Sequence, residues 1–453
     1  MKKKFILLTS TLIFISVNIN AQWALVGSAG FSAGQTYFNS IAIDGNGTPY
    51  VVYQDFGNSW NATVMKYNGT NWVNVGSPGF STDTVFYTDI AINNNNEPFV
   101  VYQDFGNSYR ATVKKFDGTN WVNVGSAGFS AGAAFYNSIA MDTNGTPYVA
   151  YQDGGNSWKA TVMKFDGTNW VNVGSPGFSP DQVVDGPKIK ISNNGTPFVV
   201  YQDPGISRKA TVMKFDGTNW TIVGLQGFSA DTAYNPSIAI DSNNTPFVVY
   251  GDYSISGKAT VMKFDGMNWV TVGAAGFSAG YALSTSIAID NNGTPLVVYS
   301  DYGNNYKATA MKFNGTNWIN VGNAGFSAGG VVYTCIKIDD NGTPYVVYQD
   351  GAHSGKATVM KFIGSNGILN TLIEIGIDIY PNPFSTQTTL QTDNLLHNAT
   401  LTVYNCFGQE VKSLVISHSP FVIERGNLPS GLYFIRLTEE NKTYAKEKLI
   451  ITD

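Results

Sequence analysis

One motif returns along most of the chain at a nearly constant interval. Seven tryptophans each begin the pattern Trp-x-x-Val-Gly, and successive tryptophans are 49 or 50 residues apart. They are Trp23, Trp72, Trp121, Trp170, Trp220, Trp269 and Trp318. A fixed period of this length indicates tandem structural repeats, in which each repeat buries its apolar faces against its neighbours.

Each repeat is predicted to contain four strands. The unit at 138–174 reads as the short strand-like runs SIAMD, PYVAYQD, ATVMKF and WVNVG. TNGT, GGNSWK and DGTN connect these runs, and Asp-Gly supplies the positive φ angles that a tight hairpin requires. The second run, such as PFVVY at 197–201, is apolar at consecutive positions, which indicates burial on both faces. We therefore predict four-stranded antiparallel meanders stacked face to face.

The two ends of the array favour a closed ring over a linear stack. The chain begins with a lone fourth strand at 23–27, and its last unit ends after the third strand at 357–362. The N-terminal strand can therefore complete the seventh unit and leave no unpaired sheet edge. We predict an all-β fold, a seven-bladed β-propeller over residues 22–362. This layout resembles the seven-bladed propellers of secreted bacterial proteins, a resemblance of architecture that carries no function.

The N-terminus and the charge predict export. Residues 1–21 have the three parts of a secretory signal peptide, with cleavage predicted near Ala21. No later stretch approaches the roughly 18 apolar residues of a membrane helix, so we predict no transmembrane span. Loss of the three signal lysines changes the net charge from −5 to −8, which argues against a nucleic-acid partner. The only two cysteines, Cys335 and Cys406, exclude a disulfide framework.

A different composition begins after a predicted linker at 363–376. Short alternating strands with Pro-Asn-Pro and Pro-Ser-Gly turns predict a small Ig-like β-sandwich over residues 377–453. In this segment IYPNPF, VYNCFGQEV, LPSGLYFIRL and KEKLII follow one another, and together they resemble the type A C-terminal sorting domain of the type IX secretion system. The resemblance implies a bacterium of the Bacteroidota, passage through the outer membrane by the type IX secretion machinery, and then release or attachment at the cell surface.

The loop after the second strand carries the candidate ligand-binding residues. An acid is present there in all seven units, an amide precedes it in five, and an aromatic residue follows in four. The predicted set is Gln54, Asp55, Trp60, Gln103, Asp104, Tyr109, Gln152, Asp153, Trp158, Gln202, Asp203, Asp252, Asp301, Tyr306, Gln349 and Asp350. Aromatic rings stack on sugars while acids and amides bind hydroxyl groups, so weak equivalent carbohydrate sites are predicted. Alternatively, each Asp caps its own loop or pairs with a nearby lysine.

Other chemistry has weaker support in the sequence. Asp-x-Asn-Gly segments such as 44–47 begin like calcium loops but lack the closing glutamate, so we interpret them as turns and predict no metal or cofactor. Asp83, Asp181 and Asp231 replace a glycine between units and could act as acid and base, although drift or glycosylation explains them equally. We assign no catalytic residue, because no nucleophile–base pair or phosphate loop is visible.

The sequence thus favours a secreted or cell-surface binding protein. This would be an adhesin or lectin-like propeller that gains avidity for glycans or surface proteins from repeated sites. Two other classes stay open: a polysaccharide hydrolase or lyase on the same scaffold, and a structural surface protein without a small ligand.

Overall fold

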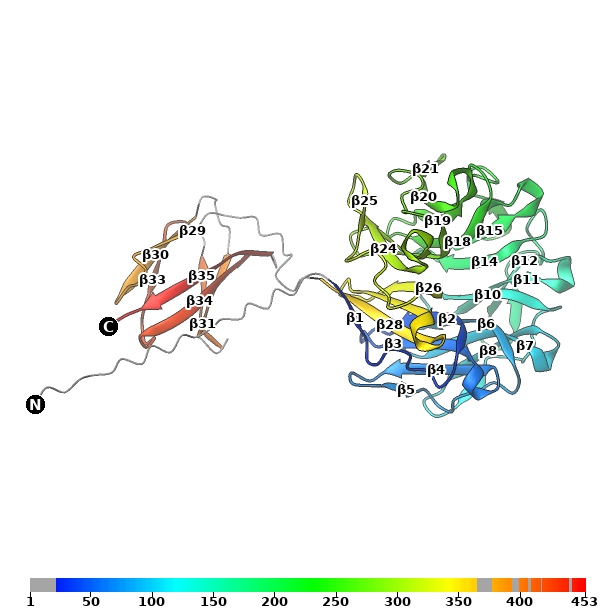
Figure 1. The fold of residues 1–453 in the computed structure, drawn as a ribbon, viewed down its shortest axis with the longest axis horizontal. Helices are drawn as coiled ribbons and strands as arrows, with labels where there is room; N and C mark the ends of the chain where they lie inside the picture. Colours follow the sequence, from blue (N-terminus) through cyan, green and yellow to red (C-terminus); the bar gives the residue numbers. More distant parts are fainter. Residues whose placement is uncertain (1–21, 365–376, 393–398, 406–408, 417, 440–441) are drawn as a thin grey trace, which may run out of the picture. The chain divides into compact units, whose positions relative to one another are not determined.

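The computed structural model describes residues 22–364, 377–392, 399–405, 409–416, 418–439 and 442–453 (Figure 1). The predicted signal peptide at 1–21, most of the predicted linker and Cys406 lie outside these residues. The chain divides into two compact units, one formed by Ala21–Ile363 and one that contains Gly364–Asp453. Within the described ranges, every secondary-structure element is a β-strand or a three-residue 3₁₀ helix. No helix of that part of the chain has the length and apolar character needed to cross a membrane.

The larger unit consists of seven four-stranded antiparallel sheets, and in six of them the strands follow in chain order. The first three sheets are formed by β2 (Thr36–Ile43), β3 (Pro49–Asp55), β4 (Asn61–Tyr67) and β5 (Trp72–Asn74); β6 (Val85–Ile92), β7 (Pro98–Asp104), β8 (Arg110–Phe116) and β9 (Trp121–Asn123); and β10 (Ala134–Met141), β11 (Pro147–Asp153), β12 (Lys159–Phe165) and β13 (Trp170–Asn172). The next three are formed by β14 (Val184–Ile191), β15 (Pro197–Asp203), β16 (Lys209–Phe215) and β17 (Trp220–Ile222); β18 (Ala233–Ile240), β19 (Pro246–Asp252), β20 (Lys258–Phe264) and β21 (Trp269–Thr271); and β22 (Ala282–Ile289), β23 (Pro295–Asp301), β24 (Lys307–Phe313) and β25 (Trp318–Asn320).

The N-terminal strand belongs to the seventh sheet. This sheet is formed by β26 (Val331–Ile338), β27 (Pro344–Asp350), β28 (Lys356–Ile363) and β1 (Gln22–Leu25). Trp23 of β1 pairs with Phe362 of β28 in antiparallel register. In Figure 1 the blue β1 accordingly runs beside the yellow β28, although the two are separated by almost the whole repeat array in sequence.

The second strand of each sheet is buried on both faces, as its consecutive apolar residues predict. Val51 and Val52 of β3 are both fully buried, but they belong to different apolar clusters. Val51 packs with Val347 of the seventh sheet, and Val52 packs with Val100 of the second sheet. Because successive residues of a strand point to opposite faces, each sheet fills the space between its two neighbours.

A tryptophan joins each sheet to the one before it. The indole Nε1–H of Trp72 donates a hydrogen bond of 2.6 Å to the carbonyl of Val26, and the ring stacks on Phe31 at 4.1 Å between centroids. The same pair of contacts recurs for all seven tryptophans, with hydrogen bonds of 2.6–2.8 Å. Trp23 makes it with Val321 and Phe326 of the preceding repeat. The seventh sheet therefore contacts both the sixth and the first.

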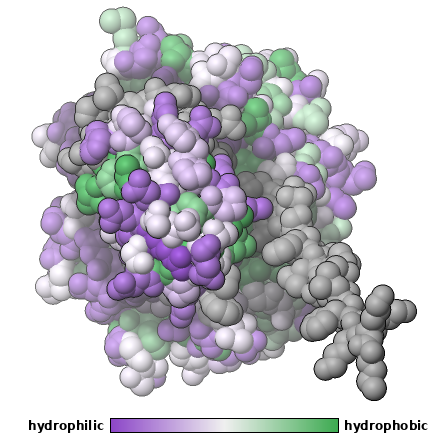
Figure 2. Space-filling model, turned by 90° about the vertical axis from the view of Figure 1, so that its left-hand side faces the viewer, coloured by the Kyte–Doolittle hydropathy of each residue, from purple (hydrophilic) through white to green (hydrophobic). Residues whose placement is uncertain are grey.

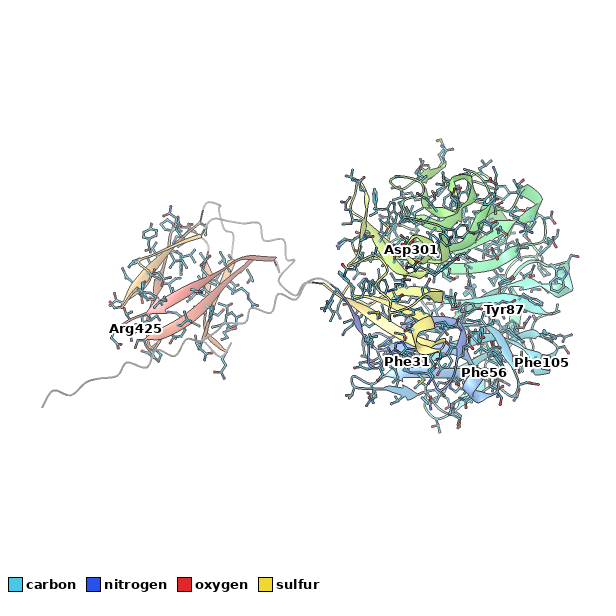
Figure 3. All side chains as sticks on the ribbon, in the orientation of Figure 1. Phe31, Phe56, Tyr87, Phe105, Asp301 and Arg425 are labelled. Carbon is cyan, nitrogen blue, oxygen red and sulfur yellow. The ribbon has the colours of Figure 1, made fainter. Side chains whose placement is uncertain are left out.

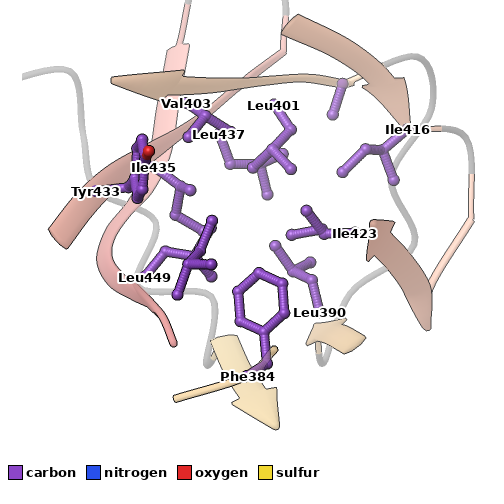
Figure 4. Packing of buried hydrophobic residues seen from close by; sticks show 12 residues of the cluster. Phe384, Leu390, Leu401, Val403, Ile416, Ile423, Tyr433, Ile435, Leu437 and Leu449 are labelled. Carbon is purple, nitrogen blue, oxygen red and sulfur yellow. The ribbon is translucent and has the colours of Figure 1, made fainter. Parts of the chain in front are cut away.

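The smaller unit contains two sheets around one apolar core. The strand order is β29 (Ile377–Tyr380), β30 (Gln387–Thr392) and β33 (Phe421–Glu424) in one sheet, and β32 (Glu410–Ile416), β31 (Ala399–Asn405), β34 (Gly431–Glu439) and β35 (Lys442–Ile451) in the other. Leu390 and Ile423 from the first sheet meet Leu401, Ile435 and Leu449 from the second (Figure 4).

The face turned to the viewer in Figure 2 mixes hydrophilic and hydrophobic residues.

Replacement of the N-terminal tryptophan should destabilise the repeat unit. Trp23→Ala removes a buried ring and its hydrogen bond, so we expect the free energy of unfolding to fall by about 3–5 kcal/mol. Chemical denaturation followed by near-ultraviolet circular dichroism measures this change. Leu25→Ala is the matched control, because Leu25 lies on the same strand and is 48% exposed. Equal effects of the two substitutions would contradict the role given to Trp23.

Candidate functional site

The first strands of all seven sheets line one cavity, which has a volume of about 310 Å³. Each of these strands contains a β-bulge after its first or second residue, where the register with the second strand shifts. Each bulge holds a residue other than glycine with a φ of 45–54°, and all seven line the cavity: Phe38, Tyr87, Tyr136, Asp185, Asn235, Ser284 and Tyr333. A side chain held in this left-handed region costs on the order of 1–3 kcal/mol, and such strain is concentrated at functional sites.

The bulge residues divide the cavity into an aromatic side and a polar side. Tyr333, Phe38, Tyr87 and Tyr136 form a continuous row, with centroid distances of 5.2, 4.8 and 4.7 Å between successive rings; we call this row the inner arc. Burial raises the pKa of Tyr87, labelled in Figure 3, to about 12, so its phenol is protonated at neutral pH. The other three bulge residues are polar.

Charged residues replace small ones at two further positions of the first strands. The residue that pairs with the middle of the second strand is Ser in four sheets and Cys335 in the seventh, but it is Asp89 in the second and Lys188 in the fourth. Two residues later, five sheets have Ala, whereas the fourth has Lys190 and the seventh has Lys337. All four charged side chains line the cavity.

Lys190 and Lys337, which we call the inner lysines, lie close enough for the charge of one to affect the pKa of the other. The positive charge of Lys337 and burial lower the pKa of Lys190 to about 7, and Asp89 opposes this shift. The carboxylate of Asp89 already accepts hydrogen bonds from Ser40 Oγ at 2.6 Å and from the backbone N–H groups of Ile90 and Ile139 at 3.0 Å each. Among the described residues, no carboxylate lies within 4.0 Å of either ammonium group.

Two asparagines in the cavity wall have polar atoms without partners. Asn39 is 7% exposed, and neither its side-chain nitrogen nor its oxygen has a hydrogen-bond partner. Asn137 is 2% exposed, and its side-chain oxygen is likewise unpartnered. Each unsatisfied buried polar group costs about 1–3 kcal/mol, and these three atoms are closed off from solvent, so they reduce the stability of the cavity wall and are not open contacts for a ligand.

The acids of the sequence-predicted ligand set are buried inside their own loops. Asp153 Oδ1 accepts the N–H of Gly155 at 2.9 Å, and its Oδ2 accepts from Asn156 Nδ2 and Thr161 Oγ1 at 2.8 Å each. The threonine contact recurs in all seven units. The acids Asp55, Asp104, Asp153, Asp203, Asp252, Asp301 and Asp350 are only 0–3% exposed. They precede the 3₁₀ helices η1 (Phe56–Asn58), η2 (Phe105–Asn107), η3 (Gly154–Asn156), η4 (Pro204–Ile206), η5 (Tyr253–Ile255), η6 (Tyr302–Asn304) and η7 (Gly351–His353).

Four of the five amides are buried as well, Gln152 is partly buried, and most of the five bond to the next sheet. Four of them donate to a backbone carbonyl at the start of the following first strand: Gln54 to Val85, Gln152 to Val183, Gln202 to Ala233 and Gln349 to Thr36. Gln103 is buried with an unpartnered side-chain nitrogen. Protein donors and acceptors occupy most of these acids and amides, with Gln103 Nε2 and Asp104 Oδ1 as exceptions, which favours the alternative in which the polar pair holds the loops together. A ligand-binding role for them stays a prediction.

Three of the four aromatic members of the set are exposed, and Trp60 is partly buried. Trp60, Tyr109, Trp158 and Tyr306 each have a φ of 60–65°, and we call them the outer arc. Trp158 packs against Phe135 at 5.4 Å, and Phe135 lies 5.8 Å from Tyr87 of the inner arc. The two arcs are therefore parts of one surface that runs from the loops to the cavity. A ligand-binding role stays a prediction for these four residues.

The remaining candidates lie away from the cavity. Asp83, Asp181 and Asp231 do not line it, and each accepts the N–H of the following residue in the link between sheets. The Asp-x-Asn-Gly segments form turns, as in Asp44, whose carboxylate accepts the N–H groups of Asn46 and Thr48. In the part of the chain that the structure describes, no group of three or more potential metal-ligating residues is present.

Sequence reasoning missed the charged residues of the cavity. The first strands read SIAI or SIAM in most repeats, but DIAI at 89–92, KIKI at 188–191 and CIKI at 335–338. These departures were visible as differences between repeats. They gained meaning only when the seven strands converged on one space, since the departing strands are about 100 to 250 positions apart.

The model of the secretion system C-terminal sorting domain family matches residues 378–452. This confirms the resemblance seen in the sequence, and it implies a protein that is exported to the cell surface or extracellular space through the type IX secretion machinery. No curated protein matches the chain.

Solved structures resemble the chain at low identity. PorZ, a surface component of the type IX secretion system of Porphyromonas gingivalis, is 15% identical with a TM-score of 0.49, over 93% of this chain and 60% of PorZ. The chain thus spans about three-fifths of PorZ. A polysaccharide lyase of family 25, an ulvan lyase, is 12% identical with a TM-score of 0.49, over 75% of this chain and 96% of the lyase. A Dyadobacter fermentans protein of unknown function is 12% identical with a TM-score of 0.44, over 76% of this chain and 98% of that protein. None of these similarities bears on function.

Removal of a loop acid should cost stability. Asp153→Ala leaves the end of η3 and the buried Thr161 hydroxyl without their acceptor, so we expect the free energy of unfolding to fall by about 2–4 kcal/mol. Asp181→Ala is the control, because Asp181 is exposed and should change stability by less than about 0.5 kcal/mol. Urea denaturation measures both changes. An Asp153→Ala variant that is as stable as the unmodified protein would contradict the role of Asp153 in holding its loop.

Lys190→Met should stabilise the protein, and by more at low pH. Because the folded-state pKa of Lys190 is about 7 and lies below its unfolded value, the unfolded chain binds the extra proton between about pH 7 and pH 10, and stability falls as pH falls through this window. The substitution removes this penalty, so the gain in Tm should be larger at about pH 6 than at about pH 10. Lys214→Met, at an exposed position of β16, should change Tm little at either pH. Equal gains at both pH values for Lys190→Met would contradict the shifted pKa.

Proposed function

We propose that residues 22–362 form a closed seven-bladed β-propeller, that residues 377–453 form an Ig-like sorting domain, and that the exported protein is a lectin-like binding protein whose ligand is a glycan. Closure is supported by the tryptophan contact, which has the same partners and length at all seven sheet junctions. Pairing of β1 with β28 supports it as well, since it gives the seventh sheet four strands like the other six.

The inner and outer arcs carry the proposal. Eight aromatic residues occupy left-handed backbone positions, where glycine would cost less strain, and those of the outer arc are partly exposed. Two equivalents of the outer arc, Gly257 and Gly355, are glycines, so the scaffold itself does not require an aromatic side chain there. The face of a sugar ring stacks on such residues, while polar groups such as Asn235 and Ser284 across the cavity can bind its hydroxyls.

The cavity favours one principal site over seven equivalent ones. Its volume of about 310 Å³ is at the small end of ligand pockets, which suits a monosaccharide or disaccharide unit. The arcs are concentrated in the first three sheets and the adjoining sixth and seventh, while the fourth and fifth contribute polar or charged residues. A glycan chain with one end in the cavity could extend along the outer arc.

Substitution of one residue from each arc tests the proposal. Tyr136→Ala should weaken binding of the best ligand on a glycan array by at least about tenfold, and Trp158→Ala by a smaller factor, because each removes a stacking surface. Titration calorimetry should give about one site per chain. Met267→Ala is the control, since Met267 is 79% exposed in a hairpin far from the arcs in the repeat. Binding that is unchanged in both arc variants would exclude this surface.

A second candidate function is cleavage of a polysaccharide. Lys190 favours it, because an amine with a pKa of about 7 is partly neutral at physiological pH and can accept a proton from a bound substrate. Incubation of the purified protein with a panel of polysaccharides, followed by size analysis of the products, separates the two functions. Chain shortening that disappears in Lys190→Met would favour the enzyme, and intact polysaccharide in every case would favour binding alone.

A further inference from the structure

We propose that the cavity binds an acidic sugar, with the carboxylate or sulfate group of that sugar held between Lys190 and Lys337. This inference rests on the proposed glycan ligand and specifies its chemical class. The two lysines come from β14 and β26, three sheets apart in the array, and they enter the same cavity. At both positions the other five sheets have alanine, so the repeat does not require a long or charged side chain there.

The positive charge in the cavity exceeds the negative charge, and no described carboxylate forms an ion pair with Lys190 or Lys337. Lys188, Lys190 and Lys337 line the cavity with only two carboxylates, those of Asp89 and Asp185. Asp89 is occupied by three protein donors, one hydroxyl and two backbone N–H groups. Neither inner lysine forms an ion pair with any described residue. Two mutually repelling ammonium groups that face one space form a site for an anion that accepts from both.

The wall of the cavity offers further partners for a bound sugar. The polar residues Asn235 and Ser284 line the cavity. Hydroxyl groups of a sugar can both donate to and accept from such residues, whereas an inorganic anion can only accept. The inner arc meanwhile offers its rings to the face of the sugar.

The size of the cavity distinguishes an acidic sugar from a free anion. About 310 Å³ is many times the volume of one water molecule, which is about 30 Å³, so sulfate alone would leave the aromatic side empty. A uronic acid or a sulfated monosaccharide places its acid group and its ring in the same volume. The lysines and the inner arc then act on two parts of one ligand.

The repulsion between the lysines gives the site a pH dependence. The groups that act on Lys190 are Lys337, Asp89 and Cys335, and Asp185 and Lys188 line the same cavity. Lys190 loses its proton as pH rises through about 7 in the free protein, so the affinity for an anion should fall across this range. A bound anion offsets the repulsion and favours the protonated form, which means that binding should take up a proton near neutral pH.

Titration of the exported chain with matched sugars tests the proposal. We expect glucuronate and glucose 6-sulfate, or one of the two, to bind at least about tenfold more tightly than glucose at about pH 6, and this preference to shrink at about pH 8.5. Separate titrations of the two acidic sugars distinguish a carboxylate ligand from a sulfate ligand. Lys190→Met with Lys337→Met should abolish the preference for acid, Lys190→Arg should preserve it, and Lys214→Met should leave it unchanged. Thermal melts confirm that each variant is folded.

Each other outcome has a distinct meaning. Glucose that binds as tightly as both acidic sugars would overturn this inference while leaving the proposed glycan ligand intact. Inorganic sulfate that binds through the two lysines while no sugar binds would overturn both. A preference for acid that survives in the folded double variant would also overturn the inference, because the charge would then be recognised elsewhere.

Discussion

The hydrogen bond from each tryptophan to the preceding repeat is the contact on which the larger unit depends. The fourth strand of a repeat has only three residues, as in Trp72–Asn74, so its own sheet holds it weakly. The indole of Trp72 reaches across to the carbonyl of Val26 and stacks on Phe31, which ties the outer edge of one sheet to the next. Trp23 makes the equivalent contact from the opposite end of the chain, and the first and last repeats thereby gain the same support as the others.

This repeated support allows local strain at the cavity. Each first strand is held by its partner strand and by two neighbouring sheets, so its bulge keeps a left-handed residue whatever the side chain. The backbone is therefore nearly identical in the repeats, while the residue at the bulge changes from Tyr87 or Tyr136 to Asp185 or Asn235. The fourth sheet has one additional residue in its bulge, which accounts for the single interval of 50 between tryptophans. A symmetric scaffold thus carries an asymmetric site.

Stability and recognition are separated within one repeat. The buried acid and its threonine, as in Asp153 and Thr161, are present in every unit and hold the loop after the second strand. The residues that differ between repeats, Asp89, Lys190 and Lys337 among them, face the cavity, and neither Lys190 nor Lys337 forms an ion pair with a described residue. Uncompensated charge of this kind reduces stability, and a site that binds a complementary ligand recovers that energy only when it is occupied.

The sequence by itself determined the repeat, the four antiparallel strands of each unit and the sorting domain, because a fixed period, Asp-Gly turns and ordered motifs are local features of the chain. It also paired the strand of Trp23 with residues 357–362 by counting strands. Only the tertiary structure decided which polar residues are available to a ligand. The sequence around Gln54 and Asp55 does not indicate whether their side chains are exposed or buried. In the structure both are buried, and Asp55 accepts hydrogen bonds from the 3₁₀ turn and from Thr63. Lys190 and Lys337 are 147 residues apart and acquire a common role only where the first strands converge on one cavity, since charge acts through space and not along the chain.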